Sequence, residues 1–176
     1  MEVIVVLLAG TAVFRLLGAF GVRRFGSWPV AAAHGMAVML LMTASAHFVP
    51  AGVTVMPNHA DLVAMVPPFV PFADAVIYAT GVLELLGAAG LVIGATRWAA
   101  GLGLATLYLL LLPANVYAAV ADVPFAGSAP TPLAQRIAEQ VLYIAIALAV
   151  TARSDRAPAL RLLRIRLTRT TVHHAS

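Results

Sequence analysis

The residue of this sequence best suited to acid–base chemistry is Glu84, because it lies inside a long apolar stretch, residues 72–95. An ionisable group in hydrocarbon is costly, so it usually faces the interior of a helix bundle, where it is paired or stays protonated. At 1.5 Å per helical residue, Glu84 lies about 18 Å from the start of its stretch, near the middle of a membrane. The position suits a proton-handling or ligand-binding acid, and a buried structural pair is the alternative.

Thr80 and Arg15 are the predicted neighbours of Glu84. Thr80 lies four residues before it, on a helical face that also carries small residues, and small residues let a second helix approach closely. Arg15, in the first apolar stretch, lies at a similar depth when counted from the outer end, so it is a candidate counter-ion. Alternatively, its long side chain extends toward the inner headgroups.

A second proton carrier is sought among His47, Tyr108 and Tyr143, since general acid–base chemistry requires groups within hydrogen-bond reach. His47 ends the second apolar stretch near the outer surface. Counting residues therefore places it rather far from Glu84. We expect Tyr108 or Tyr143 to be the better partner of Glu84.

Other polar residues mark the last two apolar stretches. Asn115 lies seven residues after Tyr108, so the two share a helical face. The last stretch begins with a polar stripe at i, i+3, i+4 and i+7 spacing, formed by Arg136, Glu139, Gln140 and Tyr143. A local Arg136–Glu139 pair is the alternative interpretation of that stripe. We expect a polar cavity in the outer half of the bundle whose ligand-binding residues are Asn115, Arg136, Gln140, Thr80 and Arg15.

The elements that position these side chains are five apolar helices. Of the 176 residues, 62 % are hydrophobic and 10 % are charged, which leaves too few charges for a water-facing surface. About 20 apolar residues cross the hydrocarbon core of a bilayer. The stretches that qualify cover about residues 3–22, 30–48, 72–95, 99–121 and 133–152. The predicted fold class is an all-α integral membrane protein.

The arginines predict how these helices are oriented, because cytoplasmic loops are rich in basic residues. Arg23 and Arg24 follow the first stretch, Arg97 separates the third from the fourth, and six arginines follow the fifth; residues 49–71 and 122–132 contain none. Five crossings place every arginine-bearing segment on one side, with the N-terminus outside and the C-terminus cytoplasmic. We expect one transmembrane domain over residues 1–152 in the inner (plasma) membrane.

The sequence also predicts where two segments outside the five helices lie. Residues 153–176 form a basic cytoplasmic tail that suits the anionic inner leaflet of the lipid bilayer rather than nucleic acid. Residues 49–71 are rich in proline yet mostly apolar, so we expect either a short interfacial helix or a plain connector.

Three groups of residues resemble the DoxX-like family of small bacterial membrane proteins. The first group, His47-Phe48 with Val66-Pro67-Pro68, is similar to the family's His-Phe and Val-Pro-Pro elements. The second, Gly81 to Gly87, is similar to its Gly-x-x-Glu-x-x-Gly element, and the third, Pro113-Ala114-Asn115, to its Pro-Ala-Asn element. The three groups follow one another in the family's order. The resemblance covers about residues 30–150. It departs from the family where Glu139 stands between Arg136 and Gln140.

The resemblance implies both a fold and a class of function. The fold is a four-helix transmembrane bundle, to which the first stretch adds one extra N-terminal transmembrane helix. The implied role is that of the membrane subunit of a redox system, since the family is named after a subunit of a thiosulfate:quinone oxidoreductase. Such a likeness is not in itself evidence for a reaction.

Three functions fit these observations. In the first, the cavity holds a lipophilic small molecule, with quinone as a candidate, for a partner oxidoreductase; the chain has no cysteine for dithiol chemistry of its own, and no cluster of metal ligands. In the second, the protein is an enzyme that isomerises or cyclises a lipophilic substrate by acid–base chemistry. In the third, it is a structural membrane subunit. Association into a homo-oligomer is compatible with each.

Overall fold

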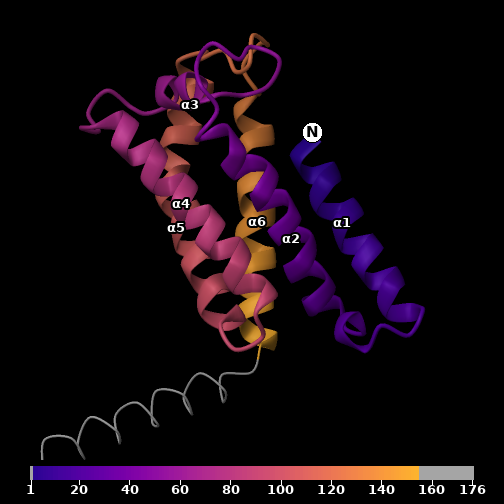
Figure 1. Cartoon of the computed structure of the whole chain (residues 1–176). Helices are drawn as coiled ribbons and strands as arrows, with labels where there is room; N and C mark the ends of the chain where they lie inside the picture. Colours follow the sequence, from indigo (N-terminus) through magenta and orange to yellow (C-terminus); the bar gives the residue numbers. More distant parts are fainter. Residues whose placement is uncertain (1, 155–176) are drawn as a thin grey trace, which may run out of the picture.

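The computed structural model describes residues 2–154, which form six α-helices and no β-strand (Figure 1). Five helices are long: α1 (Glu2–Ala19), α2 (Trp28–Ala46), α4 (Ala73–Val92), α5 (Arg97–Val120) and α6 (Leu133–Arg153). A short helix, α3 (His59–Ala64), lies between α2 and α4, and a 3-10 turn, η1 (Arg23–Phe25), joins α1 to α2. Each long helix is long and apolar enough to cross a membrane, which confirms the five predicted stretches. The predicted basic tail, from residue 155 onward, lies outside the described residues.

Local signals set the ends of these helices. α1 ends at Ala19, three residues before the predicted 22, because Gly21 adopts a φ of +100°, which glycine reaches without steric cost. α4 ends at Val92, three residues before the predicted 95. There, Arg24 and Arg97 each donate a hydrogen bond of 2.8 Å to one of the last carbonyl oxygens, which the helix itself leaves without a donor.

The long helices form a four-helix bundle with one helix added outside it. α2 packs against α4 and α6, and α5 packs against α4 and α6. α1 packs on the outer side of α2 (Figure 1). The two helices can cross closely because Gly35 has no Cβ; a Cβ there would lie 2.6 Å from the backbone nitrogen of Thr11. This is the arrangement that the resemblance implies.

Apolar side chains fill the bundle and also cover it. The largest side chains that are fully buried are Leu7, Met36, Met39, Leu40, Leu91, Leu104 and Val150. Every long helix also exposes large apolar side chains, and Leu110 on α5 is 71 % exposed. Large apolar side chains exposed on every long helix are unusual for a protein in water and typical of one that faces lipid.

The two ends of the bundle differ in charge. The start of α1, α3 and the α5–α6 connection lie at one end, which we call the α3 end (Figure 1). The α1–α2 turn, the α4–α5 turn and the end of α6 lie at the other, which we call the arginine end because Arg23, Arg24, Arg97 and Arg153 are located there. Of the two alternatives expected for residues 49–71, a short helix or a plain connector, the structure contains the helix, α3.

Candidate functional site

His47 and Glu84 form a buried polar pair between the end of α2 and the middle of α4. His47 Nε2 and Glu84 Oε1 are 3.8 Å apart, and both residues are more than nine-tenths buried. Thr43, one turn earlier on α2, donates a hydrogen bond to Glu84 Oε2 at 3.0 Å. His47 Nδ1 donates to the backbone oxygen of Ile77 at 2.7 Å, which fixes the ring and turns Nε2 toward the carboxyl group.

Gly81 allows the imidazole of His47 to lie directly against α4. A Cβ at position 81 would be 2.6 Å from His47 Cβ, closer than two carbon atoms approach, so only glycine fits. Thr80, next to Gly81, donates to the backbone oxygen of Ile77 at 2.9 Å, and its hydroxyl lies 3.4 Å from His47 Nδ1. The predicted binding residue Thr80 therefore shares its acceptor with His47 and helps to orient the ring.

The prediction that His47 lies far from Glu84 is wrong. The bond to Ile77 places His47 level with that residue, and Glu84 follows seven residues later, about 10 Å along the helix axis. Helical side chains lean toward the N-terminus of their helix, so the Glu84 side chain leans back toward the α3 end and His47. Residue counting measures the backbone alone, whereas here the two side chains close the gap.

Tyr108 and Tyr143 do not form the predicted pair with Glu84. Glu84 lies near enough to Tyr108 for an electrostatic interaction, but its hydrogen-bond partner is Thr43. The rings of Tyr108 on α5 and Tyr143 on α6 pack together with their centroids 5.6 Å apart. Both hydroxyl groups are buried, and neither has a hydrogen-bond partner among residues 2–154. Tyr108 thus lies near Glu84 with Tyr143 packed against it, and neither hydroxyl bonds to the His47–Glu84 pair.

Asn115, Arg136 and Gln140 join α5 to α6. Arg136 donates through Nη1 to Asn115 Oδ1 at 3.2 Å and through Nε to the backbone oxygen of Thr131 at 3.3 Å. Gln140 donates to the backbone oxygen of Tyr108. Arg136 and Gln140 are buried, so these bonds supply the partners that buried polar groups require. These three predicted site residues therefore connect the two helices.

Arg15 lies away from Glu84, so the ion pair considered for these residues is not formed. The guanidinium carbon of Arg15 is 5.4 Å from the centroid of the Trp28 ring, at the start of α2. The printed sequence places Trp28 four residues after Arg24, close to the arginine end. α2 lies between α1 and α4, which separates the two charges (Figure 1). The Arg15 side chain instead extends toward the arginine end, and its predicted contact with inner headgroups stays a prediction.

His59 and Asp74, neither of which is among the predicted site residues, cover the pair at the α3 end. His59 Nδ1 donates to the backbone oxygen of His47 at 2.8 Å, and Nε2 lies 3.1 Å from Asp74 Oδ1. A signal was present in the sequence: Asn58 with Asp61 three residues later is a helix-starting capping box, and it places His59 in the first turn of α3. Among the described His, Asp and Glu side chains, no three gather closely enough to hold a metal ion.

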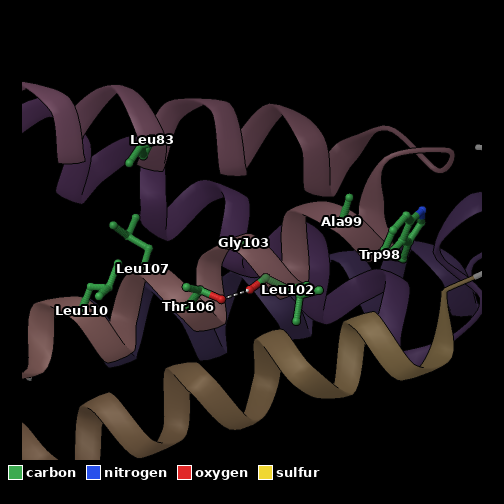
Figure 2. Close-up of a pocket in the computed structure, with 8 residues that line it drawn as sticks. All are labelled: Leu83, Trp98, Ala99, Leu102, Gly103, Thr106, Leu107 and Leu110. Carbon is green, nitrogen blue, oxygen red and sulfur yellow. Dashed lines mark hydrogen bonds between the residues drawn. The ribbon is translucent and has the colours of Figure 1, made fainter.

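Two hollows lie between α4 and α5, with volumes of about 470 and 230 Å³. Figure 2 shows the residues that line the larger one. Their lining is almost entirely apolar, and none of the predicted site residues takes part in it. The polar cavity expected from the sequence is therefore neither of these hollows. The predicted polar residues instead pack against one another and against backbone oxygens inside the bundle.

These features define a class of protein, a bundle of long apolar helices with polar residues held between them. Residues 36–151 match the model of a family described as a domain of unknown function, DUF8561, and because the match covers more than half of the chain, the protein belongs to this family. The matched segment begins within α2 and ends within α6, so α1 lies outside it. No curated protein and no solved structure matches the chain.

Proposed function

We propose that this protein crosses the inner (plasma) membrane five times and binds a lipophilic small molecule against His47 and Glu84. The apolar exterior of all five long helices supports the membrane location. The position of Arg23, Arg24, Arg97 and Arg153 at one end supports a cytoplasmic arginine end and an external α3 end. The binding site then lies in the outer half of the bundle.

The observation that carries the proposal is the separation of 3.8 Å between His47 Nε2 and Glu84 Oε1. This distance is too long for a hydrogen bond, so the two atoms face each other with unused bonding capacity. Buried polar groups in a membrane bundle are expensive and are retained where they serve a ligand or a proton path. Because His47 Nδ1 is committed to Ile77, Nε2 can accept a proton, and Glu84 can release or take one.

This chemistry suits the oxygen-bearing ring of a quinone, which exchanges protons when a partner oxidoreductase exchanges electrons with it. The DoxX-like resemblance supports the same proposal from another direction. Two of its motifs, His47-Phe48 and Gly81 to Gly87, lie far apart in the sequence and meet at this pair. The role we propose is therefore that of a DoxX-like membrane subunit of a redox system.

Retained lipophiles provide the test of binding. The protein is purified in a mild detergent, extracted with organic solvent, and analysed by mass spectrometry for quinones and other neutral lipids. We expect about one retained lipophile per chain, and at least a tenfold loss in Glu84→Gln, which corresponds to about 1.4 kcal/mol of binding free energy. Asp122→Asn, an equal charge change in an exposed connection, is the control. Equal retention by Glu84→Gln and the wild type overturns the proposal.

The orientation can be tested cleanly because the chain contains no cysteine. Ser128→Cys places a thiol in the exposed α5–α6 connection, and Ser27→Cys places one in the exposed α1–α2 connection. In intact cells, a membrane-impermeant maleimide should label the thiol at 128 and spare the one at 27 until the cells are lysed. The reverse pattern contradicts the proposed orientation.

An enzyme that isomerises or cyclises a lipophilic substrate is the second candidate. The specific observation in its favour is again the closeness of His47 and Glu84, because acid–base catalysis needs two proton carriers within reach of one substrate. Incubation of the purified protein with an added quinone or other neutral lipid, followed by the same extraction, separates the two candidates. An enzyme releases a product whose carbon skeleton or double bonds differ from those of the added lipophile, whereas a binding subunit returns the lipophile unchanged.

A further inference from the structure

The larger hollow between α4 and α5 is a groove along the outer face of the bundle (Figure 2). Its lining extends along α5 from Trp98 to Leu110, about 18 Å at 1.5 Å per residue. The hydroxyl of Thr106 within it already donates to the backbone oxygen of Leu102 at 3.1 Å. The groove therefore offers an apolar surface, in a position that faces the hydrocarbon of a bilayer.

Two residues that line this groove are sequence neighbours of buried polar residues. Leu83 on α4 and Leu107 on α5 point toward each other across the groove (Figure 2), and they directly precede Glu84 and Tyr108 in the chain. Leu107 belongs both to the groove lining and to the hydrophobic core that contains Tyr108. A molecule in the groove thus lies against Leu83 and Leu107, next to the helix positions of Glu84 and Tyr108.

The hydroxyl groups of Tyr108 and Tyr143 provide an independent sign of a ligand. Both residues are more than nine-tenths buried, and neither hydroxyl has a partner among the described residues. A buried hydroxyl without a partner is destabilising, so such groups in proteins are nearly always bonded to something. A phenolic hydroxyl can both donate and accept, and an acceptor such as a carbonyl oxygen would take the proton that it has to donate.

We infer that the α4–α5 groove receives the hydrocarbon tail of a membrane lipophile and that the Tyr108 and Tyr143 hydroxyls donate to an oxygen on its head. Separation of Leu83 from Leu107 admits the head sideways from the bilayer, beside Glu84. The inference rests on the proposed binding function and narrows it. The ligand has an acceptor oxygen at one end and a tail long enough to occupy the groove.

Gly103 provides the test, because a side chain added there enters the groove without disturbing the fold. Gly103 lines the groove, and a Cβ at this position meets no atom within 4 Å. Gly103→Phe therefore fills the groove. Leu109→Phe is the matched control, since Leu109 is an exposed residue of the same helix outside the groove lining.

Two quinones with the same head serve as probes, ubiquinone with a single isoprenoid unit and decylubiquinone with a longer alkyl chain. Binding is measured with the purified full chain in lipid nanodiscs. We expect Gly103→Phe to weaken the long-tailed probe at least about tenfold and to leave the short-tailed probe unchanged, which also shows that the variant is folded. Tyr143→Phe should weaken both probes, and Leu109→Phe neither.

The outcomes separate this inference from the proposed function. In one outcome, the wild type binds the long-tailed probe, Glu84→Gln loses it and Gly103→Phe keeps it in full. That result contradicts the role of the groove and leaves the proposed function standing. Unchanged binding of both probes by Tyr143→Phe overturns the role of its hydroxyl. A wild-type protein that binds neither probe contradicts the proposed quinone function, and with it this inference.

Discussion

Polar side chains join two pairs of helices in this bundle, and the two joints differ in how their atoms are paired. Between α5 and α6, Arg136 donates to Asn115, and Gln140 donates to a backbone oxygen. Between α2 and α4, Glu84 accepts from Thr43 but faces His47 at 3.8 Å, beyond hydrogen-bond distance. The polar groups of the α5–α6 joint therefore bond to one another or to the backbone. In the α2–α4 joint, His47 Nε2 and Glu84 Oε1 can each still form a hydrogen bond.

The difference shows which polar residues serve packing and which are available for chemistry. Interhelical hydrogen bonds in a membrane contribute about 0.6–2 kcal/mol each, so the α5–α6 joint needs no ligand to account for its polar residues. The α2–α4 joint contains two ionisable groups that are buried and not bonded to each other. Four changes, from the largest expected effect to the smallest, test this comparison.

Gly81→Leu should break the α2–α4 joint. The added side chain would overlap His47, since even a Cβ would lie 2.6 Å from His47 Cβ. We expect the free energy of unfolding to fall by about 3 kcal/mol, the upper range for overpacking. Thermal unfolding of the purified protein in detergent, followed by tryptophan fluorescence, measures the loss. Gly103→Leu, in open space, is the control, and an equal effect of both variants would show that the joint is not tightly packed.

Arg136→Met should weaken the α5–α6 joint. It leaves Asn115 Oδ1 without its donor, and a lost hydrogen bond to a charged group costs about 2 kcal/mol. The exposed Arg153→Met, on the same helix at the arginine end, should change the melting temperature little. If Arg136→Met is as stable as Arg153→Met, the α5–α6 joint does not depend on this bond.

Glu84→Gln should separate stability from binding. Glutamine has the same shape, and its carbonyl oxygen can still accept from Thr43, so we expect a change in unfolding free energy of less than about 1 kcal/mol. Retention of the lipophile should nevertheless be lost. A destabilisation as large as that of Arg136→Met, measured in the same melting assay, would support the purely structural interpretation of the His47–Glu84 pair.

Tyr143→Phe should have the smallest effect on stability. Its hydroxyl has no hydrogen-bond partner among the described residues, so its removal from the ligand-free protein costs no bond. We expect the free energy of unfolding to stay constant or to rise by at most about 1 kcal/mol, and the melting temperature to follow it. A clear loss of stability in protein freed of lipid by extensive detergent washing would show that the hydroxyl is bonded within the chain.

Much of the fold could be predicted because it depends on local properties of the chain. Length and apolar composition are enough to recognise five helices. The positions of Arg23, Arg24 and Arg97 in the connections are enough to predict that these connections lie at the same end of the bundle. The errors at the helix ends are also local, since the α1 end depends on the conformation of Gly21. The helix α3 could be predicted in outline from its apolar, proline-bounded sequence, although its capping box was not used.

The site was harder to predict because it depends on how neighbouring helices are rotated and offset. Glu84, His47 and Thr80 were all recognised as candidates, yet Glu84 was assigned the wrong partners. Arg15 contacts Trp28 instead, because α1 packs outside α2. Thr43 was not recognised, although it lies one turn before His47 and so shares its helical face.

The sequence by itself determined that the protein has five long apolar helices, one arginine-rich end and an acid in the middle of α4. Only the tertiary structure decided that His47 is the neighbour of that acid and that the tyrosine hydroxyls are left without partners. The physical reason is that hydrophobicity is a property of each segment alone. Contacts between side chains depend instead on the meeting of two helices, here where Gly81 lets His47 reach α4 and where Glu84 leans back toward it.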